Sequence, residues 1–283
     1  MPPFNIKGGK MLNATEFTYD GIPSSQYELK IASFNSDNTQ EVQYLSPAIT
    51  AVKSKKSKRF FYAGVSYENL PTYTFSVLKD TQGDENFITD QERREILGWL
   101  MDRKGFKDLL IHQPDRYQYI YRCIFSDVQI IYRNGYCVGF TLTATFDSPY
   151  CYFERLSRKM TSDGADYVTY TVDNTYSDLW DDYTYPIIKF KPTGLIDTDK
   201  LIRVYNETDD VDGIRNFTFT GTSGDLNAEI VVDNEFKTIE GTGVDLNNFN
   251  KNWLRLRHGV NILKVKINGT FEVSVRTYMK MGF

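Results

Sequence analysis

Histidine and cysteine, the residues on which much catalytic and metal chemistry depends, are scarce in this chain of 283 residues. Histidine is the commonest general base and metal ligand, yet His112 and His258 are the only two, and neither has a carboxylate, thiol or serine motif beside it. No nucleophile elbow, zinc-protease helix, phosphate-binding loop or dinucleotide fingerprint occurs. The sequence therefore disfavours an enzyme, and it implies no cofactor and no metal.

The cysteines exclude two further classes of site. Cys123, Cys137 and Cys151 lie fourteen residues apart. Zinc sites use pairs two to four residues apart, and an odd number of thiols makes a poor disulfide framework. We expect three small buried side chains in a reducing compartment, which fits synthesis in a cytoplasm.

Long hydrophobic runs are also missing. No apolar stretch approaches the roughly 18–20 residues that cross a bilayer. The first residues, MPPFNIKGGKML, lack the apolar centre of a secretory signal. We therefore expect no membrane insertion.

Positive charge is concentrated in one short run. The net charge is −4, and residues 151–283 carry 16 Lys/Arg against 20 Asp/Glu. Between residues 53 and 59 the chain has five cations, namely Lys53, Lys55, Lys56, Lys58 and Arg59. A solvated loop and a contact with a subunit or partner are both open interpretations. Nucleic-acid specificity is disfavoured, because no other basic face is evident and the chain is acidic.

The acidic stretch 208–213, TDDVDG, raises the question of a calcium loop. An EF-hand would need an acidic or amide side chain where Thr208 stands and a bidentate glutamate where Phe219 stands. Thr208 and Phe219 meet neither requirement, so the stretch does not match an EF-hand loop. A solvated turn between two strands is the expectation.

The N-terminal half predicts one helix among strands. Thr89 and Glu92 have the spacing of a capping box, and the apolar side of a helix over 91–103 includes Trp99 as a core candidate. Strands are predicted at 119–125 and 128–133, the second joined by Asn134-Gly135 to a long strand at 136–146.

The strand at 119–125 is apolar on both faces. Tyr119, Tyr121 and Phe125 lie on one face, whereas Ile120 and Ile124 lie on the other. One core covers only one face of a sheet. Tyr119, Tyr121 and Phe125 are therefore interface candidates, together with the basic run.

The C-terminal part reads as short alternating strands at 230–232, 236–239, 254–256 and 262–267, with turns between them. An antiparallel meander with Asn268-Gly269 as a hairpin turn is predicted. Trp253 stands beside a leucine-rich strand, and we expect it to pack between sheets as a core residue.

The order of these motifs resembles the distal tail proteins of siphophages. The resemblance is carried by the stretches 236–239, 250–256 and 259–265 in the second half. In the first half it is carried by the helix with Trp99, the strand at 119–125 and the closing sequence FTLTATFDSP at 140–149. It implies a mainly β chain, with a ring-forming N-terminal β domain that has one helix and a C-terminal galectin-like β-sandwich.

The resemblance also implies boundaries. Residues 1–152 would form the ring domain with a loop or arm around 34–60, and 153–182 a linker with the first sandwich strand. Residues 183–283 would form the galectin-like sandwich, the last of them free to return to the N-terminal domain. The lectin's His-x-Asn-Pro-Arg strand is absent near Trp253.

The implied function is structural. Distal tail proteins form a homohexameric ring in the virion that joins the tail tube to the tail-tip hub, to a tail-associated protein or to a receptor-binding protein. Assembly in the host bacterial cytoplasm and a place in the baseplate, where the phage attaches to its host, follow from the same resemblance. A carbohydrate-binding module for a cell-surface glycan and a glycan hydrolase with an appended sandwich remain the alternatives.

Overall fold

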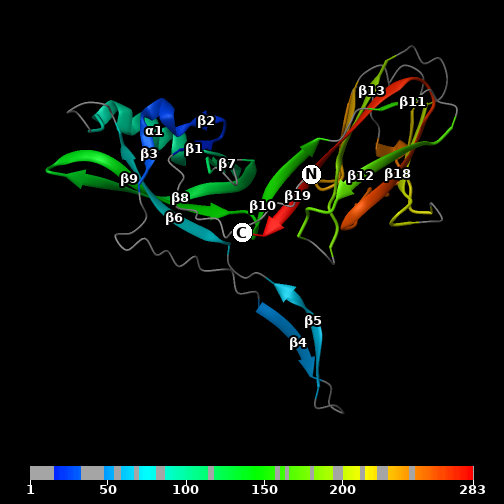
Figure 1. The fold of residues 1–283 in the computed structure, drawn as a ribbon, viewed down its shortest axis with the longest axis horizontal. Coiled ribbons are helices and arrows are strands. Elements are labelled where there is room, and N and C mark those ends of the chain that lie inside the picture. Colours follow the sequence, from blue (N-terminus) through cyan, green and yellow to red (C-terminus); the bar gives the residue numbers. More distant parts are fainter. Residues whose placement is uncertain are drawn as a thin grey trace, which may run out of the picture. The chain divides into compact units, whose positions relative to one another are not determined.

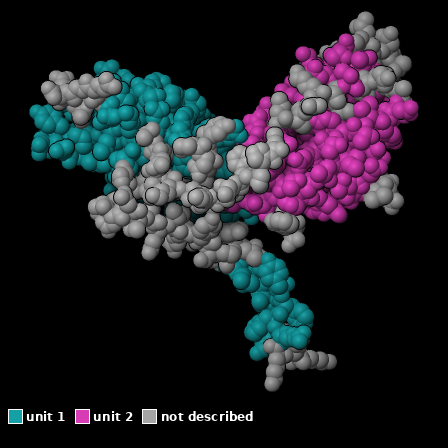
Figure 2. Space-filling view, viewed as in Figure 1, with its two compact units in different colours: residues 1–151, 283 teal, residues 152–282 magenta. Residues whose placement is uncertain are grey.

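The chain folds into two compact units that consist mainly of β-strands. The computed structural model describes residues 16–32, 48–53, 59–66, 70–80, 87–113, 118–156, 160–162, 166–178, 182–193, 200–210, 214–221, 229–241 and 246–282. One unit comprises residues 1–151 with residue 283, and the other comprises residues 152–282 (Figure 2). The predicted fold class, mainly β with one helix in the N-terminal part, is confirmed for the described residues (Figure 1).

Antiparallel strands build the sheet of the N-terminal unit. Their order across the sheet is β2-β1-β7-β8-β9-β6-β3. The strands are β1 (Phe17–Tyr19), β2 (Ile22–Pro23), β3 (Leu29–Ile31), β6 (Thr72–Lys79), β7 (Lys107–Ile111), β8 (Tyr119–Arg133) and β9 (Tyr136–Phe146).

A very short piece of chain joins the two ends of this sheet. β2 ends at Pro23, β3 begins at Leu29, and only the 3-10 helix η2 (Ser24–Tyr27) lies between them. In a flat sheet the end strands of this order would be six spacings of about 4.8 Å apart, or roughly 29 Å. Six residue steps reach at most roughly 21 Å. The sheet must therefore curl, which brings its two edges toward each other.

The helix α1 (Asp90–Met101) begins at the predicted capping box. The Thr89 hydroxyl accepts from the Glu92 amide at 3.3 Å, and the Glu92 carboxylate accepts from the Thr89 amide at 2.8 Å. The same carboxylate lies 2.6 Å from Lys79 Nζ in β6, which ties the helix start to the sheet. The predicted helix over 91–103 is confirmed, although it ends at Met101.

Strand β8 runs through the position where two strands were expected. The strand is continuous between Phe125 and Val128. A β-bulge between Phe125 and Asp127 shifts its register against β9 without interrupting the pairing. The predicted Asn134-Gly135 hairpin is confirmed. Both turn residues have positive φ, 52° and 84°, as a two-residue hairpin turn of type I′ requires.

The arm region contains a separate β-hairpin. β4 (Ala48–Lys53) pairs with β5 (Phe60–Ser66), and these two strands form a sheet of their own. A lone two-stranded hairpin is marginally stable in water, so this element needs a cover to persist.

Two sheets form a sandwich in the C-terminal unit. One has the order β17-β16-β13-β19, with β11 also pairing with β19, and the other has the order β12-β18-β14-β15. Apolar side chains from both sheets make one core between them. The strands are β11 (Met160–Ser162), β12 (Val168–Asn174), β13 (Ile187–Pro192), β14 (Lys200–Asn206), β15 (Phe217–Gly221), β16 (Ile230–Asp233), β17 (Thr238–Glu240), β18 (Gly259–Ile267) and β19 (Phe271–Gly282).

The predicted C-terminal meander is confirmed at its first hairpin, where β16 pairs with β17, but it is wrong at its end. Asn268-Gly269 connects β18 to β19, but these strands belong to different sheets. Gly269 has a φ of 109°, whereas Asn268 is absent from the positive-φ residues, so the tight hairpin turn is not made. The predicted strand at 254–256 is reduced to a single bridge between Leu256 and Thr184.

The segment 153–182, expected to hold a linker and one strand, contains more regular structure. β10 (Tyr150–Leu156) contains the boundary between the units, and β11 and β12 follow it. β12 pairs with β18 over its whole length. Its Val-Thr-Tyr-Thr-Val alternation explains why it extends along the sandwich. A second 3-10 helix, η3 (Leu246–Asn248), precedes the segment that carries Trp253.

Substitution of Gly139 in β9 is predicted to destabilise the N-terminal unit. A Cβ at this position would overlap the carbonyl oxygen of Val77 and would lie 2.9 Å from the Cα of Leu78. Because backbone atoms of β6 obstruct it, the strand itself would have to move. We expect Gly139→Ala to lower the free energy of unfolding by about 1–3 kcal/mol, measured by urea unfolding.

Gly98 in α1 supplies the matched control. A glycine inside a helix suggests a close neighbour, yet nothing lies within 4 Å of a Cβ placed there. Gly98→Ala should therefore raise stability by about 0.5–1 kcal/mol through helix propensity. A Gly139→Ala variant as stable as the parent would show that β6 can move away from the added Cβ without loss of free energy of unfolding.

Candidate interaction surfaces

The histidines and cysteines do not assemble into a reactive site. His112 Nε2 lies 2.9 Å from the Thr18 hydroxyl, and His258 Nδ1 lies 2.9 Å from the carbonyl oxygen of Ser177. Within the described ranges, no three His, Cys, Asp or Glu side chains are grouped as metal ligands would be. The same part of the chain has no helix long and apolar enough to cross a bilayer.

All three cysteines are free and buried. Burial, and then the charges of Asp147 and Asp108, raise the pKa of the Cys123 thiol to about 12. Burial also raises the pKa of Cys137. A protonated thiol is a poor nucleophile and a poor metal ligand, so the chemistry of these residues is that of small core side chains.

The β4–β5 hairpin, here named the apolar hairpin, exposes large apolar side chains on both of its faces. Val52 pairs with Phe61, and on the other face Lys53 pairs with Phe60. Single exposed apolar residues are ordinary, but a contiguous group of them marks an association site. The exposed side chains are Ile49 at 68%, Val52 at 57%, Phe60 at 65%, Phe61 at 58% and Tyr62 at 70%.

The two described residues of the basic run lie at one end of the apolar hairpin. Lys53 closes β4, Arg59 precedes β5, and both are exposed. Lys53 Nζ lies 5.8 Å from the centre of the Phe60 ring. The other three predicted interface residues of the run, Lys55, Lys56 and Lys58, lie outside the described residues.

The three aromatic interface candidates of β8 do not form an exposed surface. Tyr121 and Phe125 are 3% and 2% exposed, because this face of β8 belongs to the core of its own unit. The Phe125 ring meets Tyr19 edge-on at 4.7 Å. Tyr119 is only half-buried. The opposite face, with Ile120 and Ile124, is also half-buried, so it is the side of β8 on which apolar surface remains.

The two tryptophan core candidates differ in depth. Trp99 is 3% exposed, stacks on Phe17 at 5.7 Å between ring centres, and donates its indole N–H to the Tyr19 carbonyl at 3.0 Å. Trp253 is partly buried and packs against the sandwich core, with its ring centre 4.8 Å from that of Phe249. The neighbouring Leu254 and Leu256 are both buried in the core.

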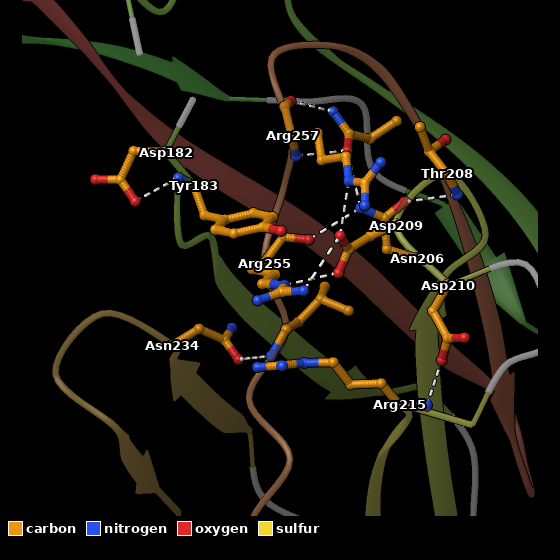
Figure 3. A network of polar contacts seen from close by, with 12 residues as sticks. Asp182, Tyr183, Asn206, Thr208, Asp209, Asp210, Arg215, Asn234, Arg255 and Arg257 are labelled. Carbon is orange, nitrogen blue, oxygen red and sulfur yellow. Dashed lines mark hydrogen bonds and ion pairs between the residues drawn. The ribbon is translucent and has the colours of Figure 1, made fainter. Parts of the chain in front are cut away.

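A buried carboxylate organises one end of the sandwich (Figure 3). Asp209, whose side chain is 3% exposed, lies 2.7 Å from Arg255 Nε and 2.8 Å from Arg257 Nε. The Arg255 guanidinium also lies over the Tyr183 ring, 3.8 Å from its centre. The expectation of a solvated turn at 208–213 is therefore wrong at Asp209, because two arginines enclose its carboxylate.

Buried asparagines hold the backbone that carries these arginines. Asn206 Nδ2 donates to the Arg255 carbonyl at 2.9 Å, and Asn261 Nδ2 donates to the Arg257 carbonyl at 2.8 Å. Asn234 Oδ1 accepts from the Leu254 amide at 2.8 Å. Side-chain amides thus take the place of a strand ladder along 254–257. The alternation Leu-Arg-Leu-Arg at 254–257 indicates an extended segment. The asparagines that hold it are not next to it in the sequence, so their role could not be recognised there.

Asp209 has a lowered pKa. Burial opposes ionisation of this carboxyl group, but hydrogen bonds and charge from Arg255 and Arg257 outweigh it and hold the pKa below its ordinary value. The ionised form is therefore the one that the fold favours.

Removal of this charge should cost stability. Asp209→Asn would leave two guanidinium groups without their shared partner, although both reach water on one side. We expect the free energy of unfolding to fall by about 1–3 kcal/mol. Glu229→Gln, which breaks an exposed pair with Lys189, is the control and should stay within about 0.5 kcal/mol of the parent. Equal effects of the two substitutions would contradict the assignment.

The same carboxylate predicts a pH dependence. Because its folded pKa is lowered, its contribution is fully present above the ordinary carboxyl value of about 3.9 and is lost as the pH falls through the folded pKa. The stability difference between parent and Asp209→Asn should therefore be constant from pH 7 to pH 5 and shrink below roughly pH 4. Urea unfolding at each pH measures it. A difference that persists unchanged at pH 2 would be inconsistent with ionisation of Asp209.

Sequence comparison assigns the N-terminal half to a phage protein family. The family described as phage tail protein N-terminal domain matches residues 12–148. Comparison with curated proteins gave no match.

Comparison with solved structures finds the same fold over almost the whole chain. The crystal structure of the Dit protein of phage SPP1, described as a paradigm of the hub adsorption apparatus in phages that infect Gram-positive bacteria, matches with 14% identity and a TM-score of 0.57. The match covers 93% of this chain and 98% of that one. Two structures of the phage P2 baseplate in its activated conformation, with Ca and with Sr, match at 11% identity with TM-scores of 0.48 and 0.49. Each covers 88% of this chain and 90% of theirs.

Residues 12–148, which lie in the N-terminal unit, are similar to the family of phage tail protein N-terminal domains. The protein is a structural phage tail protein, and the resemblance to siphophage distal tail proteins is confirmed. The chain is accordingly a component of the virion tail.

Proposed function

We propose that the protein is a distal tail protein whose copies close into a hexameric ring at the tail tip. The ring connects the tail tube to the tail-tip hub or tail-associated protein and to a receptor-binding protein. The N-terminal units form the ring, and the C-terminal unit is a galectin-like sandwich that serves host attachment. The protein is made and assembled in the host bacterial cytoplasm, and its role is structural, without catalysis.

The apolar hairpin carries the proposal. Five large side chains of β4 and β5 are more than half exposed, although a lone two-stranded hairpin is only marginally stable. A partner that covers both faces supplies the missing stability. A second copy of the chain is a partner that every copy meets, and the cations Lys53 and Arg59 lie at the same end of the hairpin.

Closure follows from the kind of contact. A hairpin of one copy that packs on a different surface of the next makes a heterologous contact, and repetition of that contact gives a ring or an open helix. The half-buried face of β8, which includes Ile120 and Ile124, is the surface we assign to the neighbouring copy. Six copies follow the family resemblance.

The ring is tested by removing the apolar contact. In Phe60→Ser combined with Phe61→Ser, we expect assembly to be lost because the hairpin can no longer be covered favourably. Mass measured by light scattering after size exclusion should fall from that of six copies to that of one. The melting temperature of the two units should change little, since both side chains are exposed.

Phe236→Ser is the matched control, because Phe236 is 64% exposed but lies in the other unit. It should assemble as the parent does. If the parent is a monomer alone, the same three proteins are mixed with the tail tube and hub proteins and imaged. A parent that enters no ring under either condition refutes the proposal, as does a double variant that assembles normally.

A further inference from the structure

One outer face of the sandwich collects positive charge that the sequence does not suggest. On the sheet β12-β18-β14-β15, Arg203 of β14 pairs directly with Lys266 of β18, and Tyr205 pairs with Lys264. Arg203 stands 61 residues before Lys264 and 63 residues before Lys266. The sequence therefore contains no run of cations that would indicate this face. The expectation that no basic face exists beyond residues 53–59 is corrected here. We name Arg203, Lys264 and Lys266 the basic face.

Two members of the basic face have no acidic partner among the described residues. Lys264 lies 3.6 Å from Glu207, but neither Arg203 nor Lys266 forms an ion pair within the described ranges. Arg203 Nε is buried and makes no hydrogen bond there. Like charges directly opposite each other on neighbouring strands destabilise a sheet, and an unsatisfied buried donor adds a further cost.

On the other sheet of the same unit, three cations form ion pairs with carboxylates. Lys189 lies 3.1 Å from Glu229, Arg276 lies 3.0 Å from Glu154, and Lys280 lies 2.9 Å from Glu235. Acidic residues outnumber basic ones in residues 151–283, 20 to 16, so partners are plentiful. Three cations of that sheet are thus ion-paired, whereas Arg203 and Lys266 form no ion pair among the described residues.

Aromatic rings and hydroxyl groups flank the basic face. Lys266 Nζ lies 5.7 Å from the centre of the Tyr167 ring, and that ring meets Tyr205 edge-on at 5.5 Å. Thr169 of β12 accepts a hydrogen bond from Lys264 at 2.9 Å. Charge, aromatic surface and hydroxyl groups therefore lie on the same face, which is the combination that sugars with acidic substituents require.

We propose that the basic face binds the oxyanion groups of an acidic polysaccharide. Neighbouring strands are about 4.8 Å apart, so one oxyanion can reach Arg203 and Lys266 together. The anion offsets the repulsion between the paired cations. The proposal rests on the proposed tail-tip function only in that such a protein meets polysaccharides at a cell surface.

An acidic protein segment is the weaker occupant. A peptide that extends a sheet adds to an edge strand, whereas the cations lie on β14 and β18, the two inner strands of the order β12-β18-β14-β15. The ligand must therefore lie across the face and be recognised by side chains alone.

The test is binding of the full-length protein to immobilised dextran sulfate, with neutral dextran as the reference. The parent should bind dextran sulfate and not dextran, and the affinity should fall as salt rises. Arg203→Gln combined with Lys266→Gln should weaken binding at least tenfold. The control, Lys189→Gln combined with Lys191→Gln, removes the same charge from the other sheet and should change binding less than twofold.

Folding and assembly are measured on the same samples. The Arg203/Lys266 variant should melt no lower than the parent, because a repulsive pair is removed. If it melts lower, Lys266→Gln alone is used, with an expected loss of threefold or more. The mass of the ring, measured by light scattering, separates this proposal from the proposed function. Intact rings that do not bind dextran sulfate would contradict the basic face as a binding site but not the ring.

Three other outcomes would overturn the proposal. No binding by the parent, or equal losses in the two double variants, would remove the basic face as the site. Binding of poly-L-glutamate as tight as that of dextran sulfate would indicate an acidic protein partner. Equal binding of duplex DNA would indicate unspecific attraction to polyanions.

Discussion

The short connection through η2 is the constraint on which the N-terminal unit depends. Because Pro23 and Leu29 belong to opposite ends of the strand order, the sheet can exist only in a curled form. Curling turns one face of each strand inward. On that face Tyr19 meets Phe125 edge-on, and Trp99 of α1 stacks on Phe17. The burial of Tyr121, which removes it from the surface, follows from the same curvature.

The sandwich has no such constraint. Its two sheets face each other across one core, and no short connection among the described residues requires either sheet to curl. Its irregular part, around 254–257, is held by asparagine side chains and by the carboxylate of Asp209. Polar groups in such a place must all find partners, so they define the backbone path more narrowly than apolar packing does. Lys189, Arg276 and Lys280 on one sheet are ion-paired, whereas Arg203 and Lys266 on the other form no ion pair among the described residues, which gives the two faces of the unit distinct chemistry.

Local signals were sufficient for the elements that depend only on neighbouring residues. The capping box at Thr89 and the Asn134-Gly135 turn are examples, because each is decided within a few positions. The same turn sequence at Asn268-Gly269 misled, since whether two strands pair is decided by the sheet each one joins. The burial of Asp209 could not be foreseen either, because Arg255 stands 46 residues away along the chain.

The buried, unreactive thiols have a practical consequence for studying assembly. Cys123, Cys137 and Cys151 are all enclosed in their units, and the pKa of the first is raised to about 12. The native protein therefore gives little background with thiol-directed dyes, so a single cysteine introduced beside Phe61 would carry nearly all of the label. Energy transfer between such labels would report how neighbouring hairpins approach as copies associate, without any change to the wild-type cysteines.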